Sequence, residues 1–194
     1  METQNTITEI HNEENLSFLR WPYDLLVDYV LKIHHRGIRT HRKEIMALLD
    51  TLCTEQKDSH PSLAQVRELF IYSMRDLELH LEKEEQMLFP YFYSLFEAYE
   101  QGKEIESIHC GEVSYPIEVM MSEHNIETKR YETISSLTGG YACSKKDTQE
   151  YCLLMQKLSS FQRDLQEHVF IENQIIFPAA IREEEEMAQK GLIK

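Results

Sequence analysis

The sequence predicts an all-α protein, folded as an antiparallel four-helix bundle. The chain of 194 residues contains only 6 glycines and 5 prolines, whereas strands need frequent turns built from such residues. Four long segments carry apolar residues at steps of three and four, and modest connections separate them. This combination is typical of antiparallel helices packed around one core.

Start and stop signals bound the four helices. Pro61 follows a polar stretch and suits the first position of a helix, Pro90 predicts a kink or a break, and Gly139-Gly140 ends a helix. The helices are therefore expected at about residues 21–54, 61–101, 117–137 and 147–187.

The bulk composition excludes several classes of protein. A net charge of −14 without a basic run would repel a phosphate backbone, so we expect no nucleic-acid partner. No stretch approaches about 20 apolar residues, so no membrane span is expected. The polar, acidic start lacks the features of a signal peptide, and the four cysteines form no CxxC pair. A cytoplasmic location is the expectation, with a polar arm over residues 1–20, one bundle domain over 21–187 and a tail over 188–194.

The second and fourth helices interrupt their apolar stripes in the same way. The segments HLEKEEQMLFP (80–90) and HVFIENQIIFP (168–178) match at His, Glu, Gln, Phe and Pro. Each places a histidine and a glutamate four residues apart on one helical face. Burying such a carboxylate is costly unless a charge or a metal compensates it. We therefore predict that His80, Glu84, His168 and Glu172 bind metal rather than forming a self-satisfied polar core.

Four further histidines are weaker candidates. His124 continues the apolar stripe of the third helix, and the two His–Glu pairs on the second and fourth helices favour its assignment as a ligand. His34 and His35 are neighbours, so at most one is expected to face the axis, and periodicity does not choose between them. His60 reads by itself as a surface residue near a helix start. Glu85 and the run from Glu183 to Glu186 read as solvated faces.

Nitrogen and carboxylate donors without thiolates fit non-haem iron, with manganese or zinc less favoured. At this point the chain resembles the hemerythrin-like di-iron proteins of the repair-of-iron-centres family. The similar features are His34-His35 followed by Arg39, the His60-Pro61 element, the pair Glu123-His124 and the two segments quoted above. Longer members carry an N-terminal cysteine-bearing domain, which we expect this chain to lack.

The resemblance implies a complete ligand set. It selects His35 over His34 and promotes His60 to a ligand, so that two oxo- or hydroxo-bridged irons would be bound by His35, His60, His80, Glu84, His124, His168 and Glu172. Five imidazoles, two bridging carboxylates and one such bridge would fill eleven of twelve octahedral positions. One position would remain for O2 or NO.

The resemblance also implies a function, namely repair of iron–sulfur clusters damaged by nitrosative or oxidative stress. Iron donation to damaged iron–sulfur proteins, or reduction of nitric oxide at the metal pair, would accomplish it, with Glu123 relaying protons. The alternative is a non-catalytic protein that binds, stores or senses O2 or NO. Whether the protein is an enzyme, and its oligomeric state, are left open by the sequence.

Overall fold

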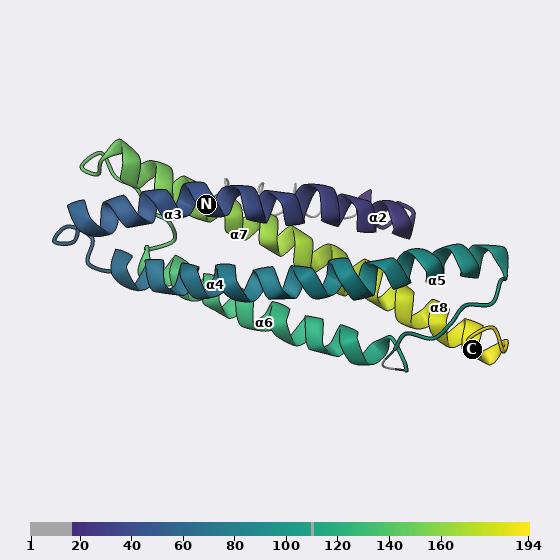
Figure 1. Cartoon of the computed structure of the whole chain (residues 1–194). Coiled ribbons are helices and arrows are strands. Elements are labelled where there is room, and N and C mark those ends of the chain that lie inside the picture. The colour runs from purple at the N-terminus through teal and green to yellow at the C-terminus, as the bar shows by residue number, and fades with distance from the viewer. Residues whose placement is uncertain (1–16, 110) are drawn as a thin grey trace.

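The computed structural model describes residues 17–109 and 111–194, and it confirms the all-α antiparallel bundle (Figure 1). The first rod consists of α2 (Tyr23–Tyr29), the π-helical turn η1 (Val30–His35) and α3 (Arg36–Glu55). The second consists of α4 (Leu63–Lys83), the π-helical turn η2 (Glu84–Leu88) and α5 (Phe89–Gln101). The third is α6 (Ser114–Leu137), and the fourth joins α7 (Gln149–Ile171), the π-helical turn η3 (Glu172–Ile176) and α8 (Phe177–Gln189).

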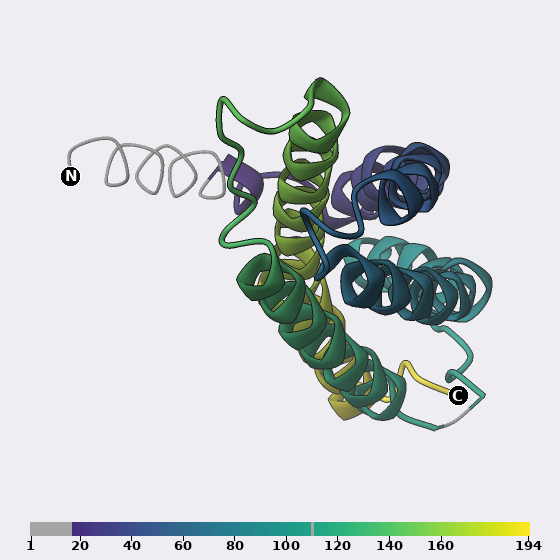
Figure 2. The same ribbon diagram turned by 90° about the vertical axis from the view of Figure 1, so that its left-hand side faces the viewer.

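Successive rods run in opposite directions, so the α3–α4 and α6–α7 connections lie together at one end of the bundle (Figure 1). The α5–α6 connection and the C-terminus lie at the other end. Figure 2 shows the four rods side by side, viewed nearly along their axes. The α3 helix packs against α4 and α7, and α6 closes the ring by packing against the same two helices.

The helix ends follow the signals in the sequence. Gly102 ends α5 with φ 62°, a left-handed conformation that glycine adopts without strain. Thr148 begins α7, and its side chain accepts a hydrogen bond from the Tyr151 backbone N–H. Of the predicted N-terminal arm, residues 1–16 lie outside the described residues, while Phe18 is buried against Trp21 and Tyr29. Within the predicted C-terminal tail, Ile193 forms an isolated parallel β-bridge with Ile105.

The second rod is helical throughout at Pro90, where the sequence predicts a kink or a break. Pro90 and Pro178 each occupy the second position of the α-helix that follows a π-helical turn. A proline ring clashes with the preceding turn of an ideal α-helix, and a wider π turn makes room for it. The inserted residue also shifts the register. Met87 follows Glu84 by three residues and would share its face in a regular α-helix, but it is 53% exposed, and Leu88 is buried in its place.

The interior consists of two apolar clusters. One lies at the end of the bundle formed by α5 and α8 and contains Phe89, Phe92 and Phe177. The other lies toward the α3–α4 and α6–α7 connections and contains Phe70, Phe161 and Tyr131. The π-helical turns lie between these two clusters along three of the rods.

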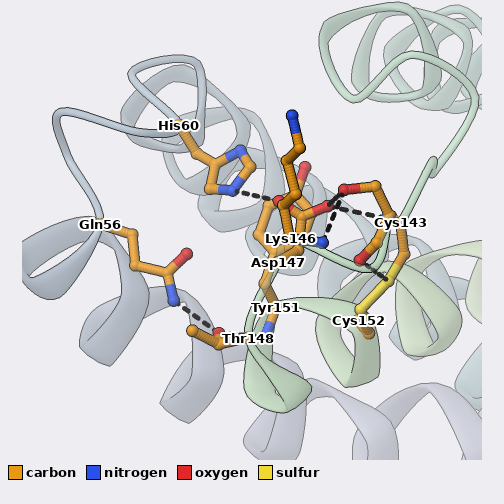
Figure 3. Close-up of a disulfide and its surroundings, with 9 residues drawn as sticks. Gln56, His60, Cys143, Lys146, Asp147, Thr148, Tyr151 and Cys152 are labelled. Atoms are coloured by element: carbon orange, nitrogen blue, oxygen red, sulfur yellow. Dashed lines mark hydrogen bonds and ion pairs between the residues drawn. A yellow bond between two sulfur atoms is a disulfide. The ribbon is translucent and has the colours of Figure 1, made fainter.

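Two further features concern the surface and the cysteines. Among the helices of the described residues, none has both the length and the apolar character needed to span a bilayer. Cys143 and Cys152 are joined by a disulfide that links the α6–α7 loop to the first turn of α7, with their Cα atoms 5.3 Å apart (Figure 3). Cys53 is a free thiol.

Candidate metal centre

Six side chains meet in the layer between the two apolar clusters, and each is at most 2% exposed. Three of the rods deliver them through their π-helical turns, because His35 ends η1 and the two glutamates begin η2 and η3. The α4 and α7 helices supply the histidine one turn before each glutamate, and α6 supplies the remaining one. The six are His35, His80, Glu84, His124, His168 and Glu172.

These residues form two groups that share both glutamates. One group adds His35 and His168 to the glutamates, the other adds His80 and His124, and within each group the ligand atoms lie within 4.8 Å of one another. Among the described residues, no other group of potential metal ligands lies so close together.

Each glutamate directs one oxygen toward each group. Glu84 Oε2 lies 3.4 Å from His35 Nε2, and its Oε1 lies 3.2 Å from His80 Nε2. Glu172 Oε1 lies 2.9 Å from His168 Nε2, and its Oε2 lies 3.1 Å from His124 Nε2. All four imidazoles therefore present Nε2 to the centre, which is the arrangement of two metal positions joined by two bridging carboxylates.

The outward-facing Nδ1 atoms of three histidines donate hydrogen bonds that fix their rings. His35 Nδ1 donates to Glu85 Oε1 at 2.8 Å, and His80 Nδ1 donates to Glu123 Oε2 at 2.8 Å. His124 Nδ1 donates to Asn173 Oδ1 at 2.9 Å. Such partners hold the Nε2 lone pair toward a metal and raise its basicity.

Charges outside the centre orient two of these partners. Arg39 donates from Nη1 and Nη2 to the two oxygens of Glu85, at 2.6 and 3.2 Å. Lys83 forms an ion pair with Glu123. Despite partial burial, which opposes the change, Arg39 and His35 lower the pKa of Glu85, and Lys83 and His80 lower the pKa of Glu123. Both carboxylates are therefore ionised acceptors.

The centre itself is strongly polarised. Burial acts to lower the pKa of His80, but the charges and hydrogen bonds of Glu84, Glu172 and Glu123 together outweigh it and raise that pKa to about 9. At His168 burial prevails over the attraction of Glu172, and the pKa falls to about 4. The imidazoles hold the pKa of Glu172 well below its usual range, although burial opposes this. The centre is built to keep two carboxylates charged in an apolar core.

The unsatisfied atoms of the core show that the centre fits cations. Burying a polar atom without a partner is costly, and a buried charge needs a counter-charge or a metal. Among the described residues, eight buried side-chain atoms have no hydrogen-bond partner, and seven of them belong to the six-residue centre. They include all four carboxylate oxygens of Glu84 and Glu172. Two cations bound by nitrogen and oxygen donors would satisfy the six of these atoms that face the centre, all except His168 Nδ1.

The structure does not bring His60 to the centre. His60 Nε2 lies 3.2 Å from Asp147 Oδ1, and its ring stacks on Tyr151 at the end of the bundle (Figure 3). The ring is held there because the α6–α7 loop places Asp147 against the start of α4. Without this imidazole, four histidines, two bridging carboxylates and one bridging oxygen would fill ten of twelve octahedral positions, leaving one open on each ion.

Both members of the His34-His35 pair are buried, but only His35 belongs to the two groups of the centre. The π-helical turn η1 widens the spacing along the helix. It allows His35 to point into the centre while His34 packs against α7, where its ring stacks on that of His168 at 5.7 Å.

Sequence reasoning missed two functional partners and misplaced two acidic residues. The sequence pattern indicates a solvated Glu85 and no role for Asn173, whereas in the structure each directly follows a glutamate of the centre and fixes a histidine. That position is the signal that would have found them. Glu183 and Glu184 are buried rather than solvated; Glu184 accepts hydrogen bonds from Tyr91 and from the Val113 backbone.

A four-helix bundle with two buried His2Glu2 groups sharing both glutamates defines a class of cation-binding bundle proteins. Comparison with protein families agrees. The chain belongs to the hemerythrin family, since residues 26–180 match the model described as the hemerythrin HHE cation binding domain.

Several curated relatives cover most of the chain at low identity. Iron-sulfur cluster repair protein DnrN of Neisseria gonorrhoeae is 27% identical over 156 residues, which are 80% of this chain and 90% of that protein. Iron-sulfur cluster repair protein ScdA of Staphylococcus epidermidis is 23% identical over 177 residues, 89% of this chain and 75% of the relative. Iron-sulfur cluster repair protein YtfE of Yersinia pseudotuberculosis is 24% identical, covering 91% and 73% respectively.

Proposed function

We propose that this protein binds two iron ions and acts in the repair of iron–sulfur clusters damaged by nitrosative or oxidative stress. The pair of buried groups that share Glu84 and Glu172 carries the proposal. The repair role is supported by relatives named as iron-sulfur cluster repair proteins. Iron is favoured over zinc and manganese because imidazole and carboxylate donors with open positions suit non-haem iron.

In this proposal the protein holds the ions and manages protons. The four imidazoles bind, two to each ion, and the two glutamates bridge. Bound iron would supply two electrons, so that two molecules of nitric oxide and two protons give nitrous oxide and water. Glu123, 32% exposed and bonded to His80 Nδ1, would pass protons between solvent and the histidine.

A pocket offers small ligands a way in. It has a volume of about 510 Å³ and lies between α4 and α6. His80, His124, Glu123 and Glu127 are among the residues that line it, together with apolar side chains such as Leu79 and Ile126. Nitric oxide and O2 are small and weakly polar, so they suit a partly apolar entrance that reaches two of the metal-binding histidines.

The decisive experiment combines anaerobic metal analysis with a reaction. Protein purified without added metal should contain about two irons per chain, and the reduced form should convert nitric oxide to nitrous oxide or restore an iron-depleted iron–sulfur enzyme. The E84Q and E172Q variants should lose iron and both activities, while E132Q, at an exposed residue of α6 that does not line the pocket, should retain them. Activity that persists after both substitutions would overturn the proposal. Reversible NO or O2 binding without turnover would instead identify a carrier or sensor.

We also propose a cytoplasmic location, where damaged iron–sulfur proteins would be the partners. There the Cys143–Cys152 pair would be largely reduced in unstressed cells, since glutathione and thioredoxin keep thiols reduced. Thiol-trapping of the two cysteines in cells, with and without nitrosative stress, tests this location. A disulfide that is fully formed in unstressed cells would argue for an oxidising compartment.

A further inference from the structure

The hydrogen bonds around the centre follow an internal pattern. Glu85 directly follows the bridging Glu84 and holds His35, and Asn173 directly follows the bridging Glu172 and holds His124. The histidines of the first and third rods are thus held in the same way, by hydrogen bonds from their Nδ1 atoms to residues of the second and fourth rods.

By the same pattern, the histidines of the second and fourth rods should be held by the residue that directly precedes a ligand on the third and first rods. Glu123 precedes His124 and holds His80. The equivalent residue before His35 is His34, and it lies against His168 as the pattern requires. The imidazole of His34 therefore occupies the position that corresponds to the carboxylate of Glu123.

This imidazole does not serve His168. The two rings are nearly parallel, at 14°, and His34 Nε2 points toward Glu167 Oε1 at 3.3 Å. Glu167 also accepts a hydrogen bond from the Tyr29 hydroxyl at 3.0 Å. Among the described residues, His168 Nδ1 is buried with no hydrogen-bond partner. Within the described part of the chain, it is the only one of the four histidines in the centre whose outward nitrogen has no hydrogen-bond partner.

We propose that the two metal positions differ in strength, and that the ion bound by His35 and His168 is the one released first. This inference rests on the proposed two-metal function. His34 is then a positioning residue, because its identity leaves His168 without an acceptor. An unequal pair suits a protein that donates iron, since one ion can leave while the other keeps the centre folded.

The physical reason lies in the basicity of the ligands. An imidazole that donates its other N–H to a carboxylate or an amide is oriented and is a stronger ligand, and losing such a partner costs roughly 10–100-fold in metal affinity. The His80 and His124 position has a carboxylate and an amide as outer partners. The His35 and His168 position has only the carboxylate of Glu85.

The test follows metal release from the fully loaded protein mixed anaerobically with an excess of a coloured Fe(II) chelator. We expect two phases of one ion each, with rates differing by about tenfold or more. In H34Q, the new amide can donate to Glu167 and accept from His168 Nδ1, so the fast phase should slow by about tenfold. In N173A, His124 loses its acceptor, so the slow phase should accelerate by a similar factor.

The H60Q variant is the matched control, because it makes the same substitution at a histidine outside the centre. Both of its phases should be unchanged. A single phase that releases both ions from the unsubstituted protein, or a fast phase accelerated by N173A, would overturn the unequal-pair inference while leaving the two-metal function intact. Protein that binds no iron would instead overturn the proposed function. Should H34Q not fold, N173A alone still distinguishes these outcomes.

Discussion

At the scale of single residues, the bridging glutamates decide whether the centre exists. Glu84 and Glu172 each direct one oxygen to each metal position, so replacing either removes a ligand from both. We expect E172Q to lower the affinity for both ions by at least about 100-fold, more than the loss of an outer partner. Titration of metal-free protein with Fe(II), with E132Q as control, measures this. Retention of one tightly bound ion in E172Q would contradict the bridging role.

Arg39 makes a second residue-scale prediction, because it acts on the metal only through Glu85. The R39A variant should let Glu85 rotate away from His35 and weaken binding by roughly tenfold, the lower end for outer partners. Arg42 is the matched control. Like Arg39, it approaches Glu78, at 3.8 Å, but it forms no ion pair with Glu85. If R42A and R39A weaken metal binding equally, general surface charge rather than orientation of His35 is responsible.

The sequence predicted these residues to different degrees. Periodicity alone singled out the His80–Glu84 and His168–Glu172 pairs, because a carboxylate on an apolar stripe is unusual and the repeat made it more so. His124 needed that company. His35 and His60 rested on resemblance, and the structure brings only His35 to the centre. Nothing local in the sequence reveals that Asp147, far along the chain, lies against His60.

At the scale of elements, the π-helical turns explain where the periodic reading failed. Each adds a residue to a turn, so a position just after Glu84 that steps of three and four place inside the bundle can be displaced to the surface. Met87 is exposed and Leu88 buried for this reason. The prolines at 90 and 178 gave the position of the irregularity, but not its kind, because a proline is compatible with a kink, a break or a wider turn.

The contact between α4 and α6 makes an element-scale prediction about pH. Glu127 on α6 accepts a hydrogen bond from Ser73 on α4 at 2.7 Å, and burial raises the pKa of Glu127 despite Ser73 and Arg130. A raised folded-state pKa stabilises the fold below the unfolded value, and this contribution is lost as pH rises through the folded value.

The E127Q variant should therefore gain stability relative to the natural protein as pH increases from about the ordinary glutamate value of 4.5. Urea unfolding of the metal-free proteins at several pH values measures this difference. A difference that stays constant, or that falls with increasing pH, would show that the Arg130 ion pair outweighs burial.

The α6–α7 loop makes the second element-scale prediction. The Cys143–Cys152 disulfide closes a loop with a sequence separation of 9, which corresponds to about 2.6 kcal/mol in the chain-entropy model of cross-links. We expect C143S, or reduction, to lower the free energy of unfolding by roughly 2–3 kcal/mol without changing metal content. Reduction of C143S is the control. It should have no further effect on stability, because this variant lacks the disulfide and Cys53 is already a free thiol. Equal stability of oxidised and reduced protein would contradict this.

At the scale of the whole molecule, the protein consists of two apolar clusters joined by a polar layer. Phe89, Phe92 and Phe177 belong to the cluster on one side, and Phe70 and Phe161 to that on the other. The layer between them contains the buried atoms of the centre that lack partners. Cohesion between the two halves therefore depends on what neutralises Glu84 and Glu172.

Metal removal should consequently reduce the stability of the whole molecule. An ion that binds only the folded state stabilises it by about 4 kcal/mol when present at a thousandfold excess over its Kd, which for a chain of this length corresponds to a rise in Tm of roughly 8–16 °C. We expect calorimetry to show this rise on loading metal-free protein, and hydrogen exchange to slow most around His80, Glu84, His168 and Glu172. The E84Q variant is the control, because it removes one of the two buried charges and should respond far less to added metal. If the metal-free protein unfolds at the same temperature as the loaded one, the polar layer is satisfied without cations, and the bundle is a metal-independent scaffold.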